Sequence, residues 1–209
     1  SPAVPLGFVP DEEHLSRARA LLDRTAAVDI HAHPGRTFVR DASGLSTVIW
    51  LYALGGAFEE TTVEDMQAGG LAAASFAAVA DFQILDLSNG GLKARRPFQP
   101  AEAWASYQRQ IANLKALAGR LPLRVAREAS DIAAAKAEGR VAALLTVEGG
   151  DFLEGDLSRL AKAEADGIRS ITIVHYRNNE IGDIQTAAAE NGGLTEFGEE
   201  AIREMTRLG

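Results

Sequence analysis

The sequence predicts an α/β protein built on a parallel sheet, and three observations lead to this prediction. Apolar runs at 71–80, 141–147 and 168–174 have the length and composition of strands that are covered on both faces. Segments with helical periodicity separate these runs, so strands and helices alternate along the chain. Ionisable residues follow several of the runs, at the strand ends where parallel α/β proteins place their chemistry.

Length and composition limit the classes of function. The chain has 209 residues, which is enough for one well-buried core or two small domains. Its net charge of −8 and its lack of a basic cluster argue against a nucleic acid partner, because clustered lysine and arginine bind phosphate backbones. The absence of cysteine excludes disulfides, thiolate metal sites and a cysteine nucleophile. No apolar run reaches the roughly 18–20 residues of a membrane span.

An N-terminal arm and a helix form the first predicted unit, residues 1–25. Residues 1–10 are rich in proline and are expected to be extended. Residues 11–24 place apolar side chains on one helical face and charges on the other. His14 lies in the first turn of this helix, and we interpret it as a surface residue. The second predicted unit, residues 26–209, begins with the first strand of the sheet.

Helices and strands alternate through this second unit. Residues 37–70 give mixed signals and contain a helix that ends at Gly69. Residues 81–99 are polar and are interpreted as a loop beside the active face, and Ser130 is the expected N-cap of a later helix. Helices are expected at 104–119, 130–138, 157–165 and 195–208, and strands at 71–80, 124–128, 141–147 and 168–174. The buried face of the last helix is expected to consist of Phe197, Ile202, Met205 and Leu208.

Two histidines form the end of the first predicted strand. The run 26–30 ends at His31 and His33, and Pro34-Gly35 stops the strand. Because residues i and i+2 of an extended backbone point to the same face, the two imidazoles would enter one space. Imidazole is the commonest metal ligand. Chance surface histidines are the alternative, but only four histidines occur in the chain and two of them share this strand end, which favours a metal pair.

Two further strand ends carry ionisable residues, Glu148 and His175. Glu148 taken alone would also fit a carboxylate that stabilises the dipole of the next helical turn. His175 taken alone would equally fit a core histidine bonded to a carbonyl. In a parallel sheet all carboxyl ends lie on one face, so these residues would meet His31 and His33. The coincidence of ionisable groups at three strand ends therefore favours a shared metal site.

Three motifs add a resemblance to a known family. They are Glu148-Gly149-Gly150 after an apolar strand, His175-Tyr-Arg-Asn178-Asn179, and Gly193-Leu-Thr195-Glu-Phe197-Gly198 at the start of the last helix. In this order and spacing the motifs resemble the membrane (renal-type) dipeptidase family of the metal-dependent amidohydrolases, over residues 26–209. The resemblance implies a TIM (β/α)8 barrel of the amidohydrolase type, of which this chain covers roughly the first half.

The resemblance also implies an activity and roles for the strand-end residues. His31 matches a histidine that binds one zinc ion, and Glu148 matches a carboxylate that bridges two. Together with His33, which the spacing of the two histidines adds, these residues form the predicted metal site. His175 matches a histidine that binds the substrate and polarises its scissile carbonyl, so Glu148 and His175 are the catalytic candidates. The implied activity is zinc-dependent hydrolysis of a dipeptide amide bond by a metal-activated hydroxide, with a small-molecule substrate.

Position 33 departs from the family pattern. The dipeptidases usually have aspartate where His33 stands, two residues after the first histidine. Imidazole and carboxylate both bind zinc at about 2.0–2.2 Å, so a metal still fits. The exchange removes one negative charge, however, and this affects metal preference and substrate range. Another amidohydrolase activity, on an N-acyl amino acid, a lactone or a related substrate, is therefore the alternative.

The length of the chain is a second departure. A TIM barrel has eight strands and takes about 250 residues. This sequence has 209 residues and supplies only four or five strands. The later zinc histidines, the substrate-binding arginine and the catalytic aspartate of the family would follow Gly209. We therefore expect the N-terminal part of a larger enzyme, completed in a longer polypeptide or by a second chain; a catalytically incomplete fragment is the other alternative. We also expect a homodimer, and an extracytoplasmic location such as the periplasm rather than the cytoplasm.

Overall fold

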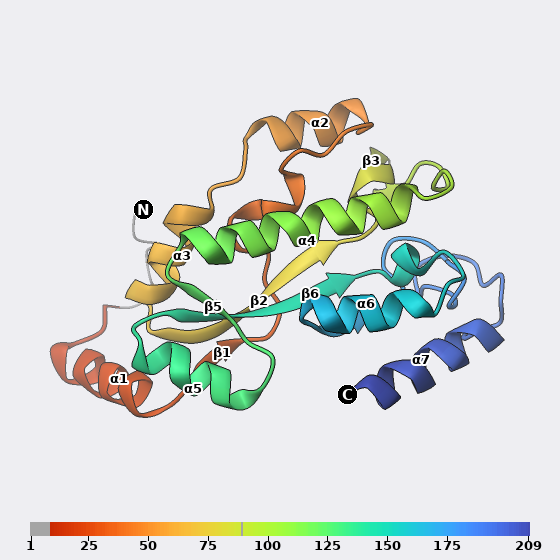
Figure 1. Ribbon diagram of the computed structural model, residues 1–209. Coiled ribbons are helices and arrows are strands. Elements are labelled where there is room, and N and C mark those ends of the chain that lie inside the picture. The colour runs from red at the N-terminus through yellow and green to blue at the C-terminus, as the bar shows by residue number, and fades with distance from the viewer. Residues whose placement is uncertain (1–8, 89) are drawn as a thin grey trace.

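A parallel sheet forms the centre of the protein (Figure 1). The computed structural model describes residues 9–88 and 90–209, and within them the sheet has five strands. β2 (Leu71–Val79) and β6 (Val141–Glu148) are its two long strands and pair in parallel from Ala73 opposite Ala142 to Val79 opposite Glu148. Their carboxyl ends therefore lie side by side. The parallel pairing confirms the predicted fold class.

Shorter strands extend the sheet on both sides of this central pair. β1 (Ala27–Asp29) pairs in parallel with β2. β5 (Leu123–Val125) pairs with the first part of β6, and β7 (Ile168–Thr172) pairs with its last part. The predicted strands at 124–128 and 168–174 are thus present but shorter at their carboxyl ends.

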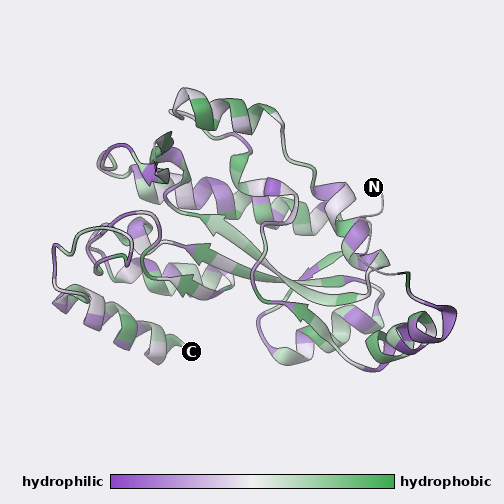
Figure 2. Ribbon diagram, turned by 180° about the vertical axis from the view of Figure 1, so that it is seen from behind, coloured by the Kyte–Doolittle hydropathy of each residue, from purple (hydrophilic) through white to green (hydrophobic). Residues whose placement is uncertain are grey.

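Helices cover the sheet on both faces. The main core lies where β2 and β6 meet the helices on one face, and Phe76, Leu145 and Tyr107 are among its fully buried side chains. A small alanine cluster joins the sheet to the helix on the other face. Figure 2 shows predominantly apolar strands at the centre of the protein, with helices of mixed apolar and polar residues around them. The helices are α1 (Glu12–Arg24), α2 (Thr47–Leu54), α3 (Glu59–Ala68), α4 (Glu102–Arg120), α5 (Ala129–Ala137), α6 (Ser158–Asp166) and α7 (Glu196–Leu208).

A hairpin replaces the loop that was predicted at 81–99. The hairpin consists of β3 (Leu85–Ser88) and β4 (Gly91–Ala94) in antiparallel pairing, after the 3-10 turn η2 (Phe82–Ile84). Apolar and polar residues alternate in both of its strands, which is the two-residue period of a β-strand. The prediction of a loop took account only of the polar composition and was wrong. Other 3-10 turns are η1 (Pro34–Val39) and η3 (Gly150–Leu153).

Two predicted helix details are wrong. The N-cap of α5 is Glu128 rather than Ser130, because the Asp131 carboxylate accepts a hydrogen bond from the Glu128 backbone N–H at 3.2 Å. Ile202 is 38% exposed rather than buried. The reason is that α7 packs against α6, outside the sheet layers, and buries only a narrow stripe that includes Ala201.

The N-terminal unit is described in part. The arm predicted at 1–10 lies mostly outside the described residues, and the division of the chain at residue 25 stays a prediction. His14 is exposed, as predicted, and its backbone N–H donates to the Asp11 carboxylate at 2.8 Å. Among the described residues, no helix is both long and apolar enough to span a membrane.

Candidate metal centre

The two histidines lie beyond the first strand rather than on it. β1 ends at Asp29, so His31 and His33 belong to the segment that connects it to η1. This segment still runs alongside β2, because the Ala77 N–H donates to the Ala32 carbonyl at 3.2 Å. The expected placement on a strand is thus wrong in detail, but both imidazoles remain at the carboxyl edge of the sheet.

A tight turn after His33 is held by α3. Gly35 has φ +66°, and a Cβ built on it would lie 2.3 Å from the Cα atom of Glu59, so only glycine fits. The Gly35 carbonyl accepts the Phe58 N–H at 2.9 Å. The fully buried Glu59 carboxylate receives Arg40 Nη2 at 3.0 and 2.8 Å on its two oxygens. These contacts anchor the segment that carries the histidines.

Glu148 meets both histidines. It is the last residue of β6, and strand alternation turns its side chain away from the face on which Leu145 and Val147 enter the main core. His31 Nε2 lies 2.9 Å from Glu148 Oε1, and His33 Nε2 lies 3.1 Å from Glu148 Oε2. One potential ligand atom from each of the three residues lies within 4.8 Å of the others. We refer to His31, His33 and Glu148 as the metal cluster.

The charges of the cluster are coupled. Burial disfavours the ionised form of Glu148, but the hydrogen bond from His33 and the nearby imidazole charges outweigh burial and hold the pKa of Glu148 below its ordinary value. The hydrogen bond to Glu148 raises the pKa of His33, against a smaller opposing effect of burial. The carboxylate is therefore ionised, and it favours the protonated form of the His33 imidazole.

The donor set fits a divalent metal ion. Two imidazole nitrogens and one carboxylate oxygen are a ligand combination that zinc and similar ions accept. A ligating imidazole is neutral, so a bound cation would take the place of the positive charge that protonated His33 places beside Glu148. The side chain of His31 is 62% exposed and that of Glu148 is 10% exposed, which gives an ion access from one side.

His175 faces the metal cluster without joining its hydrogen bonds. It lies three residues beyond the end of β7, and its Nε2 is 3.7 Å from Glu148 Oε2. Its Nδ1 donates to Asp81 Oδ1 at 2.8 Å, and the other oxygen of this fully buried carboxylate accepts the Tyr176 N–H at 2.8 Å. Burial lowers the pKa of His175, but the hydrogen bond and the charge of Asp81 outweigh burial and raise it. Asp81 therefore fixes the orientation of the imidazole.

Sequence reasoning missed two buried carboxylates here, Asp81 and Asp151. Arg177 donates to Asp151 Oδ1, while Asp151 Oδ2 has no hydrogen-bond partner among the described residues. Burial, followed by the negative charge of Asp81, raises the pKa of Asp151 to about 6, against the effect of Arg177. Asp81 follows the apolar run 71–80 directly. It thus carries the same strand-end signal that singled out Glu148.

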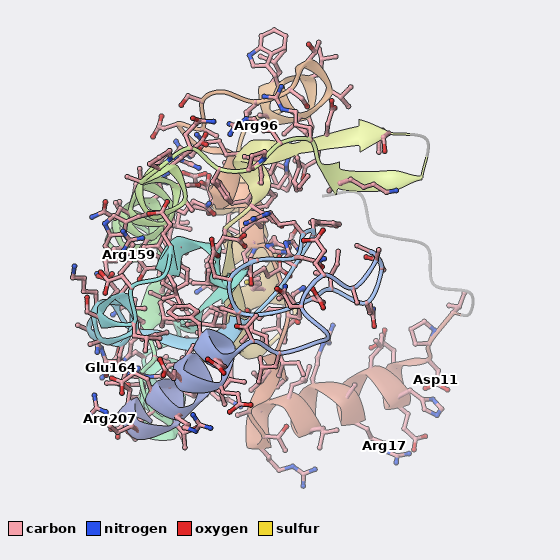
Figure 3. All side chains as sticks on the ribbon, turned by 90° about the vertical axis from the view of Figure 1, so that its right-hand side faces the viewer. Asp11, Arg17, Arg96, Arg159, Glu164 and Arg207 are labelled. Atoms are coloured by element: carbon pink, nitrogen blue, oxygen red, sulfur yellow. The ribbon has the colours of Figure 1, made fainter. Side chains whose placement is uncertain are left out.

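The surroundings of the cluster are loops and the hairpin. Figure 3 views the molecule toward the carboxyl ends of β2 and β6, with β3–β4 and the segment 173–195 on the near side. Arg96, labelled there beside the hairpin, donates to Glu102 at 2.7 and 2.6 Å and so joins the end of the hairpin segment to α4. The hairpin and the segment 173–195 therefore surround the carboxyl edge of the sheet, where the metal cluster lies.

A parallel α/β sheet with a His-His-Glu cluster at its carboxyl edge is typical of metal-dependent hydrolases of the amidohydrolase class. The sequence profile of the membrane dipeptidase family (peptidase family M19) matches residues 15–209. The chain therefore belongs to the membrane dipeptidase family, which confirms the resemblance noted in the sequence.

Similar solved structures support the fold. The probable dipeptidase PvdM from Pseudomonas aeruginosa matches with a TM-score of 0.69 and 18% identity over 93% of this chain and 47% of that one. An amidohydrolase from the same organism matches with 0.63 and 20% identity over 92% and 46%. A metallo peptidase from Rhodobacter sphaeroides, liganded with a phosphinate mimic of L-Ala-D-Ala, matches with 0.57 and 20% identity over 88% and 57%. The chain thus has the α/β fold of the amidohydrolase TIM-barrel dipeptidases and spans about half the length of these structures.

Proposed function

We propose that this chain takes part in the zinc-dependent hydrolysis of a dipeptide amide bond. His31, His33 and Glu148 are the proposed metal ligands, and His175 is the proposed substrate-binding residue. The observation that carries the proposal is the convergence of two imidazoles and one carboxylate on one space at the carboxyl edge of the sheet. Membership of the membrane dipeptidase family supports a dipeptide as the substrate class.

Each residue contributes through an atom that already faces the site. His31 and His33 present Nε2, and Glu148 presents an ionised carboxylate between them. These groups would hold a divalent ion, which would supply a coordinated water of lowered pKa and a Lewis acid for the substrate carbonyl. The Nδ1–H of His175 donates a hydrogen bond to Asp81, which leaves Nε2 facing the site. When Nε2 is protonated, it can donate to the carbonyl oxygen of the substrate as negative charge develops on that oxygen. The raised pKa of His175 favours that protonated form.

The proposal is confined to part of an active site. The chain spans about half the length of the solved structures that it matches, so we assign to it the first metal ligands and the substrate histidine. In a complete enzyme Glu148 would also help to hold a second zinc ion. This second ion, a homodimer and an extracytoplasmic location are further parts of the proposal.

His33 favours a second candidate activity. Its imidazole lies against Glu148 at 3.1 Å, where the family usually has an aspartate, and the cluster therefore carries one negative charge less. A less negative metal site changes the pKa of a bound water and the substrates that it accepts. Hydrolysis of an N-acyl amino acid or a lactone is the candidate that this change favours.

A substrate panel with histidine variants tests the proposal. The zinc-loaded protein is assayed with L-L and L-D dipeptides, N-acyl amino acids and lactones. We expect hydrolysis of dipeptides, a loss of about 100-fold or more in kcat for His175→Ala with zinc retained, and no change for the exposed control His14→Ala.

Each other outcome has a definite meaning. Hydrolysis of N-acyl amino acids or lactones alone would replace the dipeptidase by the second candidate. Loss of zinc from the His175→Ala variant would show that His175 is a metal ligand. Absence of hydrolysis for every substrate class, with zinc retained, would refute hydrolysis by this chain alone and would favour the alternative of a catalytically incomplete fragment.

A further inference from the structure

The geometry points to a subsite for a large apolar side chain of the substrate, beside the metal cluster. This inference rests on the proposed function, because it assigns a specificity to the same site. A cavity of about 650 Å³ is lined by His31, His33, Glu148 and His175 on one side. A group that fills the cavity therefore lies directly next to the groups proposed to act on the amide bond.

The rest of the cavity is apolar. Apart from the metal cluster and His175, the described residues that line it carry aliphatic or aromatic side chains, and among these only Tyr52 and Tyr176 bear a polar group, the hydroxyl. Its floor is formed by buried residues of η1 and η2, and the rings of Phe38 and Phe82 meet edge to face with centroids 4.9 Å apart. These side chains belong to a hydrophobic cluster that is separate from the main core. The floor is therefore a preformed apolar surface.

The rim of the cavity is apolar but exposed. Val48 of α2 is 41% exposed, and Leu87 of the hairpin is 58% exposed. Figure 2 shows α2 as a predominantly apolar helix at the surface of the protein. Exposed apolar side chains around a cavity lose contact with water when an apolar group enters, and this burial favours binding.

The same lining discriminates against polar side chains. An amide or a charged group that enters the cavity loses water, and beyond the metal cluster and His175 the walls offer it only the hydroxyls of Tyr52 and Tyr176 as polar partners. Burial of such a group is therefore largely unpaired and unfavourable. Leucine and asparagine have nearly the same shape, so they isolate this effect. The free energy of burying a leucine side chain corresponds to a preference of about 10- to 100-fold for leucine.

Binding of two dipeptides to the full 209-residue chain tests the subsite. Leu-Leu and Asn-Asn are titrated by NMR into the metal-free protein, and Leu-Gly and Gly-Leu then show which residue of the dipeptide occupies the cavity. We expect Leu-Leu to bind about 10- to 100-fold more tightly than Asn-Asn. Val48→Asp should abolish this preference, because it places a carboxylate at the rim. The matched control Leu51→Asp lies on the same helix, is 58% exposed and does not line the cavity, so it should keep the preference.

The outcomes separate this inference from the proposed function. Equal binding of the two dipeptides, undetectable binding of Leu-Leu, or an equal loss in both variants would overturn the subsite. A loss that coincides with dissociation of a dimer would assign α2 to a subunit interface and would also overturn it. Because the titration uses metal-free protein, a failure of zinc binding or hydrolysis would leave a preference for Leu-Leu in place and would refute only the catalytic proposal.

Discussion

Gln110 completes the hydrogen bonding of β2 next to the candidate site. This α4 side chain is 1% exposed. Its Nε2 donates to the Val79 carbonyl at 2.8 Å, and its Oε1 accepts the Val79 N–H at 2.8 Å. The amide thus acts as the hydrogen-bonding partner of the last residue of the strand. Val79 lines the cavity, and Asp81, which holds His175, follows two residues later.

Gln110→Met isolates this contribution. Methionine keeps the length of the side chain but removes both the donor and the acceptor, so the buried N–H and carbonyl of Val79 lose their partners. Each unpaired buried group costs about 1–3 kcal/mol, so the loss of both partners should lower the free energy of unfolding by about 2–6 kcal/mol. The exposed residue Gln108 on the same helix provides the control, and Gln108→Met should change the free energy by less than about 0.5 kcal/mol.

Urea unfolding followed by far-UV circular dichroism measures both variants. Linear extrapolation to water gives the free energy of unfolding, and unchanged m-values show that the comparison is valid. The reasoning fails if Gln110→Met costs less than about 1 kcal/mol, or if the control variant loses as much stability.

Two further predictions concern buried carboxylates. Arg40→Met leaves the fully buried Glu59 without its bidentate partner and should cost about 2–4 kcal/mol by urea unfolding. The double variant Arg40→Met/Glu59→Met should recover at least half of that loss, and no recovery would contradict an ion-pair origin. The raised pKa of Asp151, about 6 against an ordinary 3.8, means that its ionisation opposes folding as the pH rises through this interval. Relative to Asp151→Asn, the wild type should therefore lose about 2 kcal/mol of unfolding free energy between pH 4 and pH 7, whereas parallel stability curves would show that Asp151 ionises freely in the folded protein.

Local sequence patterns predicted the main strands and helices, and the ionisable residues at the strand ends. The apolar runs and the glycines that end helices identified the long strands, and Glu148 and His175 stood out because ionisable residues followed buried strands. Strand order and register are non-local properties. The sequence could therefore predict that Glu148 would face the first histidines, but only the pairing of β1, β2 and β6 determines that both imidazoles reach its two oxygens.

Other features were beyond local reasoning. Asp81 carries a local strand-end signal, but its role as the partner of His175 is not local, because His175 lies 94 residues away in the chain. The cavity depends in the same way on where α2 and the hairpin fold back beside the sheet. Backbone turns such as the one at Gly35 control that path, and their conformation depends on contacts with α3. Sequence periodicity does not encode such contacts.

Zinc titration is the most direct test of the metal cluster. Isothermal titration calorimetry of the metal-free chain compares the wild type with Glu148→Gln and His14→Ala. We expect zinc to bind the wild type and the His14→Ala control equally. The Glu148→Gln variant should bind zinc at least about 100-fold more weakly, because loss of a direct ligand exceeds the 10- to 100-fold cost of losing an outer partner. Equal zinc affinity of the wild type and Glu148→Gln would contradict the account.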